Sequence, residues 1–130
     1  MPKATADFAK TFDTLRGILK REGKKLLVTG DGPDGYQLSS RTMVDRIGRP
    51  MFVAAVQINK NYVSYHLMPV YGMPDLLKGL SPSLKKRMQG KSCFNFTTID
   101  ATQVRELTTL TRTGIRRFKN FDVPWDQTSK

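Results

Sequence analysis

Apolar side chains near the start of the chain recur at the spacing of an α-helix. Their offsets from the first are four, seven, ten and eleven positions, which puts on one face Phe8, Phe12, Leu15, Ile18 and Leu19. Such a stripe is typical of an amphipathic helix that packs against a core. Asp7 near the start and Lys20 and Arg21 near the end suit the helix dipole, and Gly23 is a suitable stop. We therefore predict a helix over residues 4–21.

The next part of the chain alternates between short extended runs and turn formers. Residues 24–29 and 36–41 flank a loop rich in glycine and aspartate, which predicts a β-hairpin. Residues 51–58 are nearly all apolar, as in a strand that is buried on both faces or central in its sheet. A compact turn leads from there into a strand at residues 62–68. This pattern predicts a second hairpin.

Two helix starts are predicted after the second hairpin. Residues 74–77 begin with proline and aspartate and should form a short helical turn. Ser81 precedes Pro82, and a hydroxyl N-cap followed by proline favours a helix start. Gly90 is the expected end of that helix.

The last regular elements are a strand and a long helix. In residues 92–98, Phe94 and Phe96 alternate with Cys93 and Asn95, so the aromatic row should face the core. An Asp-x-x-Gln capping box then opens a helix predicted over residues 100–119.

These elements fit a single α+β domain over residues 1–130. The economical arrangement is a mostly antiparallel sheet with helices packed on one face, in the order α-β-β-β-β-α-β-α. A chain of 130 residues can bury a core of its own. We expect residues 121–125 to lie over the body as an extended cover and residues 126–130 to fray.

The cysteine content and the apolar runs indicate the compartment. Cys93 is the single cysteine and has no partner for an intramolecular disulfide. The first residues lack the apolar run of a secretion signal. The longest strongly apolar stretch, residues 51–56, is far shorter than the roughly 18 residues that span a bilayer. We expect a cytoplasmic protein that does not span a membrane.

The charge balance indicates one class of binding partner. Lysine and arginine number 22 against 11 aspartates and glutamates, which gives a net charge of +11 and a pI near 10.1. Such a charge either keeps a small domain soluble or attracts polyanions such as nucleic acid. The cations that would contact phosphates are Lys85, Lys86, Arg87, Lys91, Arg105, Arg112, Arg116 and Lys119. Because most aromatic residues should face the core, any such binding should be unspecific and weakened by salt.

Residues with chemical potential gather between positions 62 and 96. This stretch holds the only histidine, His66, together with Cys93 and three of the four tyrosines. Strand alternation permits His66 and Cys93 on one face of the sheet if their strands are neighbours. Two ligands are too few for a zinc site, and covalent catalysis needs an activated thiol and an orienting group as well. We therefore expect no metal, no cofactor and no enzyme activity; a half-buried cysteine and a hydrogen-bonded histidine are the simpler interpretation.

A small ligand is the function that this stretch favours. Residues 69–74 form a turn-rich connection, and such connections often form the lip of a pocket. Lys91 would anchor an anion, and Tyr71 would stack on the ligand or hydrogen-bond to it. The expected ligand-binding residues are Tyr65, His66, Tyr71, Lys91, Cys93 and Asn95.

Three segments resemble one known family. They are residues 48–56, residues 62–69 and residues 90–96, followed by a final helix that ends in Arg117 and Phe118. In these segments the chain resembles the YdhG-like family of small, mostly uncharacterised bacterial proteins. The resemblance implies an α+β fold.

Some relatives in that family are described as frataxin-like iron chaperones. Iron loading needs several oxygen ligands in one place, and here Asp31 and Asp34 are the only close acidic pair outside the helices. A net positive charge also repels cations. Iron binding is therefore the least favoured function, after a cytoplasmic small-ligand module and a polyanion-binding protein.

Overall fold

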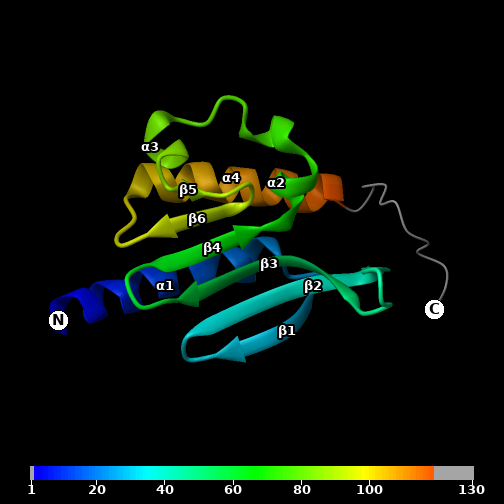
Figure 1. Ribbon diagram of the computed structural model, residues 1–130, viewed down its shortest axis with the longest axis horizontal. Coiled ribbons are helices and arrows are strands. Elements are labelled where there is room, and N and C mark those ends of the chain that lie inside the picture. The colour runs from blue at the N-terminus through cyan, green and yellow to red at the C-terminus, as the bar shows by residue number, and fades with distance from the viewer. Residues whose placement is uncertain (1, 119–130) are drawn as a thin grey trace.

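The chain forms one antiparallel sheet with helices packed on it (Figure 1). The computed structural model describes residues 2–118. Its helices are α1 (Pro2–Glu22), α2 (Met68–Gly72), the short 3-10 helix η1 (Pro74–Leu77), α3 (Pro82–Lys85) and α4 (Ala101–Phe118). Its strands are β1 (Leu27–Gly32), β2 (Gly35–Val44), β3 (Pro50–Ile58), β4 (Val63–Leu67), β5 (Met88–Gln89) and β6 (Cys93–Phe96). The predicted α+β class is confirmed.

The six strands lie in the order β1-β2-β3-β4-β6-β5, and all neighbours are antiparallel. Both predicted hairpins are present, and β3 is central, as its apolar sequence indicated. The edge strand β1 has a shift in register between Val28 and Gly30, and the opposite edge strand β5 has only two residues. The fold thus places β6 directly beside β4, although 25 residues lie between Leu67 and Cys93 in the sequence.

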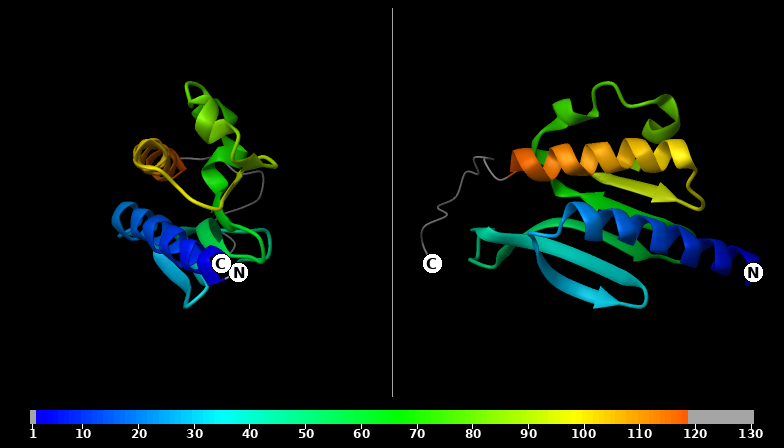
Figure 2. Two further views of the ribbon diagram at one scale, coloured as in Figure 1. Left: turned by 90° about the vertical axis from the view of Figure 1, so that its left-hand side faces the viewer. Right: turned by 180° about the vertical axis from the view of Figure 1, so that it is seen from behind.

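Helices α1 and α4 cover the same face of the sheet (Figure 2). Their apolar stripes meet the inward rows of the strands, as the spacing in residues 4–21 predicted. The largest fully buried side chains are Tyr65, Phe94, Phe96, Leu15, Ile18, Leu19, Leu38, Leu67, Leu84 and Leu107. The opposite side of the sheet, which we call the open face, carries the alternate residues of each strand.

Hydrogen bonds confirm two of the helix starts that the sequence predicted. At α4, the Gln103 amide donates to Asp100 Oδ1 at 2.7 Å and the Asp100 amide donates to Gln103 Oε1 at 3.1 Å, a complete capping box. At α3, the Leu84 amide donates to Ser81 Oγ at 3.3 Å, and Pro82 occupies the first turn.

The segment between Ser81 and Gly90 differs from the prediction. The helix ends at Lys85, and the chain then pairs Met88 and Gln89 with β6. The helix does not continue to Gly90 because the strand pairing packs Met88 against the core beside Phe94, and this contact outweighs local helix propensity.

The C-terminal predictions fall on residues 121–125 and 126–130, which lie outside the described residues. Within residues 2–118, no helix is both long and apolar enough to cross a membrane.

Candidate functional site

The pairing of β4 with β6 brings His66 and Cys93 together. The two residues are direct partners in the register of these strands. Tyr65, which precedes His66, contacts Thr111 of α4, so alternation directs His66 to the open face. The sequence allowed His66 and Cys93 to lie on one face of the sheet, and the strand order makes them neighbours.

A hollow of about 350 Å³ opens beside this pair. We call it the open-face hollow; it is lined by His66, Met68, Tyr71, Gln89, Gly90, Lys91, Ser92 and Cys93. Strands β4, β5 and β6 form its base, and helix α2 contributes Tyr71. Gly90 has a φ of 80°, a conformation that favours glycine, and it turns the chain from β5 toward β6.

His66 is held in a fixed orientation. Its Nε2 lies 2.8 Å from Ser92 Oγ, and its ring meets the Phe52 ring edge-on at a centroid distance of 5.2 Å. Burial lowers the pKa of His66, so the imidazole is neutral at neutral pH. A neutral ring offers one donor and one acceptor nitrogen.

Cys93 is a neutral thiol. Burial raises its pKa, and its Sγ donates a hydrogen bond to Asn95 Oδ1, with 3.6 Å between the two atoms. Since the thiolate is the nucleophilic form, this environment suits a contact residue better than a reactive one.

Tyr71 and Lys91 form the exposed rim of the hollow. The Tyr71 side chain is 56% exposed, and Lys91 Nζ lies 5.9 Å from the centre of its ring. This is within the range of a cation–π contact. Gly114 lets α2 pack close to α4, because a Cβ on this residue would lie 3.1 Å from Pro69 Cβ. The helix that carries Tyr71 is thus packed against α4.

Four of the six predicted ligand-binding residues therefore share one hollow: His66, Tyr71, Lys91 and Cys93. Asn95 contacts Cys93 on the same face but does not line the hollow. Tyr65 points to the opposite face and is fully buried. The prediction that Tyr65 binds a ligand is therefore wrong, because strand alternation places its side chain in the core.

Sequence reasoning missed four residues of this hollow, which are Met68, Gln89, Gly90 and Ser92. Ser92 is 6% exposed and orients His66, whereas Gln89 and Met68 complete the wall. Gln89 lies on β5, which the pattern had placed in a helix. The one local signal for Ser92 is its hydroxyl directly before the strand that pairs with His66.

The predicted phosphate-contacting cations do not form one surface. Lys91 belongs to the open-face hollow, and Lys85 and Lys86 are exposed around the end of α3. Arg87 is partly buried, and Lys119 lies outside the described residues. On α4, exposed cations stand at intervals of seven and four residues and share one helix face: Arg105, Arg112 and Arg116.

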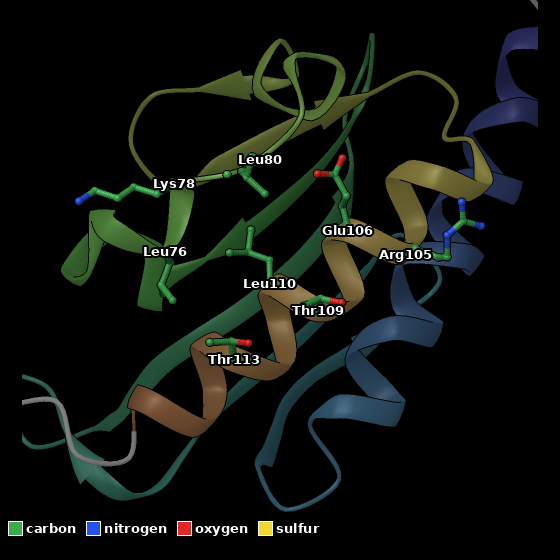
Figure 3. A pocket seen from close by; sticks show the side chains of 9 residues that line it. Leu76, Lys78, Leu80, Arg105, Glu106, Thr109, Leu110 and Thr113 are labelled. Atoms are coloured by element: carbon green, nitrogen blue, oxygen red, sulfur yellow. The ribbon is translucent and has the colours of Figure 1, made fainter.

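A second hollow, of about 380 Å³, lies between α4 and the segment that joins η1 to α3 (Figure 3). Leu76, Leu80 and Leu110 give it an apolar wall, and Glu106 points from α4 toward that segment. The Glu106 carboxylate accepts hydrogen bonds from the Ser81 amide at 2.9 Å and from the Ser81 hydroxyl. Glu106 therefore fixes the start of α3.

Within residues 2–118, no three histidine, cysteine, aspartate or glutamate side chains are grouped so as to hold a metal ion. Comparisons of the chain with protein-family models, curated proteins and solved structures found no match. The resemblance to the YdhG-like family therefore stays a prediction.

Proposed function

We propose that the protein is a cytoplasmic, non-enzymatic module that binds a small planar anion in the open-face hollow. The observation that carries this proposal is the convergence of His66, Tyr71, Lys91 and Cys93 on one hollow. Lys91 supplies a positive charge, the Tyr71 ring supplies a stacking surface, and the neutral His66 supplies hydrogen bonding. The neutral state of the Cys93 thiol supports binding over covalent chemistry.

Benzoate is a suitable probe because it combines an aromatic ring with a carboxylate. His66 is the only histidine, so its ring signals in NMR report on this hollow alone. We expect benzoate to shift these signals and benzyl alcohol to shift them less. Replacing Lys91 with glutamine should weaken benzoate binding about two- to fivefold, the range of an exposed charge contact.

The matched control is Lys60→Gln, which removes an exposed cation from the β3–β4 turn, outside the hollow. This variant should bind benzoate as the wild type does. The proposal fails if benzoate at millimolar concentration leaves the His66 signals unmoved, or if Lys91→Gln and Lys60→Gln bind equally well.

Polyanion binding is the second candidate, and the exposed row of Arg105, Arg112 and Arg116 on α4 favours it. Phosphate contacts require cations on one surface and no particular base sequence. Three such contacts to single-stranded nucleic acid predict a slope of about −2 in log K against log salt concentration.

The test is a fluorescence titration of a labelled single-stranded oligonucleotide at several salt concentrations. Replacing Arg105 and Arg116 with glutamine should reduce the steepness of that slope by about 1.4, at roughly 0.7 per lost contact. Lys60→Gln should leave the slope unchanged. Absence of binding at low salt would remove this candidate.

A further inference from the structure

A groove on the helix-covered side of the sheet is separate from the proposed benzoate site, although it includes Arg112 and Arg116 of the second candidate. It has a volume of about 590 Å³ and lies where the end of α1, strand β2 and the end of α4 meet. The open-face hollow is smaller, at about 350 Å³, and is built from other elements. We call the larger of these two features the cationic groove.

The lining of the cationic groove is strongly positive. Its cations come from three separate parts of the chain: Arg21, Lys24, Lys25, Arg41, Arg112 and Arg116. Glu22 is the single carboxylate among the lining residues. Convergence of this many like charges is unfavourable unless solvent or a bound anion compensates them.

The one carboxylate is already neutralised. Arg112 donates from Nε to Glu22 Oε1 at 3.0 Å and from a terminal nitrogen to Oε2 at 3.2 Å. The hydrogen bond from Arg112 holds the pKa of Glu22 below its usual range, so Glu22 is ionised at neutral pH. This pair leaves the other five cations with no carboxylate among the lining residues.

One of those cations is held in place by the backbone. Arg41 donates from Nε to the Lys25 carbonyl oxygen at 3.1 Å, across the start of the β1–β2 pair. Its terminal guanidinium nitrogens remain available for a bidentate contact with a carboxylate or phosphate.

The floor of the cationic groove is apolar. Leu26 and Ile115 are partly buried, and Met43, Val53 and Phe118 are nearly completely buried. A phosphodiester chain gains nothing from such a floor, whereas a hydrocarbon chain or ring does. The groove thus combines an apolar base with a cationic rim.

We propose that the cationic groove binds a small amphipathic anion, with its carboxylate or phosphate head on the arginines and its apolar body on the floor. Arg21, Arg41 and Arg116 would contact the head. Leu26, Met43 and Ile115 would contact the body. The site is independent of the open-face hollow, which lies on the opposite side of the sheet.

Octanoate and acetate together test this proposal, because they share a head group and differ in the apolar body. Titration calorimetry on the 130-residue chain should show octanoate binding at least about tenfold more tightly than acetate, as several methylenes leave water. In NMR, octanoate should shift the Met43 methyl signal. That signal reports on the groove floor, whereas His66 reports on the open-face hollow.

Two variants separate the contributions of the rim and the floor. The double replacement Arg21→Gln and Arg116→Gln should weaken octanoate binding about tenfold, while Lys60→Gln should leave it unchanged. Leu26→Gln should weaken octanoate and leave acetate unaffected. Urea midpoints would verify that each variant is folded. For the wild type alone, raising the salt concentration from 50 to 500 mM should weaken octanoate binding severalfold.

Three results would overturn the proposal. They are equal affinities for octanoate and acetate, an unshifted Met43 signal at saturating octanoate, and octanoate binding that is insensitive to both salt and the arginine replacements. Displacement of octanoate by an oligonucleotide, with no gain from the octyl chain, would instead mark the groove as part of a polyanion surface. Binding of octanoate that survives Lys91→Gln would separate this site from the proposed benzoate site.

Discussion

Replacement of Phe94 by alanine is expected to lower the free energy of unfolding by about 3–5 kcal/mol, the range for deleting a fully buried aromatic ring. Phe94 is 0% exposed and lies in register between Tyr65 on β4 and Met88 on β5. Removing its ring would leave a cavity beside both neighbours. Urea unfolding followed by circular dichroism would measure the change as a lower midpoint with a similar m-value.

The neighbouring residue provides the control for that experiment. Asn95 lies on the open face and is half-buried, so Asn95→Ala should change the free energy of unfolding by less than about 1 kcal/mol. A shift of one residue in the register of β6 would exchange the two faces. Equal losses in Phe94→Ala and Asn95→Ala would therefore contradict the pairing of β4 with β6.

The second large effect is expected at the buried contact between Tyr65 and Thr111. The two hydroxyl oxygens are 2.6 Å apart, and both residues are 0% exposed. Tyr65→Phe leaves the Thr111 hydroxyl without this partner and should cost about 1–3 kcal/mol. Adding Thr111→Val should recover part of that loss, because the unpaired hydroxyl is then gone as well. Strict additivity of the two replacements would contradict a shared hydrogen bond.

Tyr65 should also make the protein sensitive to alkali. Burial raises the pKa of its phenol well above the usual value, so the folded protein keeps the proton after the unfolded chain, with a tyrosine pKa of about 10, has lost it. The stabilisation is complete below pH 10 and should decline by about 1.4 kcal/mol per pH unit above it. Tyr65→Phe should remove this additional slope. Tyr36, whose pKa burial also raises, is present in both proteins and cancels in the comparison.

Local patterns in the sequence predicted most elements of this fold. The apolar stripe of α1 and the capping box of α4 each lie within one stretch of chain, and the structure confirms both. The alternation of Phe94 and Phe96 likewise assigned the core face of β6. In these cases the information is contained in residues close together in sequence.

The prediction errors arise where contacts between residues distant in sequence determine the local structure. Leu84 and Met88 stand four residues apart, which suggested one continuous helix, but Met88 pairs with Phe94 and the Arg87 carbonyl accepts from the Asn95 amide at 2.7 Å. The order of β4 and β6 is a similar non-local property, and on it depends whether His66 and Cys93 meet. Neither can be derived from periodicity.

The same distinction between local and non-local information applies to the candidate site. Alternation already separated Tyr65 from His66, so the burial of Tyr65 follows from the sequence once the period is applied strictly. The cationic groove could not be predicted, because Arg21, Arg41 and Arg116 come from three distant segments. Only the packing of α1, β2 and α4 together reveals that their charges converge.

The two edges of the sheet bear on how the protein behaves at high concentration. An exposed edge with a long, regular row of free backbone groups can recruit a strand from another molecule and begin aggregation. Here β1 has an irregular register and an aspartate between glycines near its end, and β5 offers two residues. Both edges are thus poor templates for a further strand, which helps the open sheet to remain unextended.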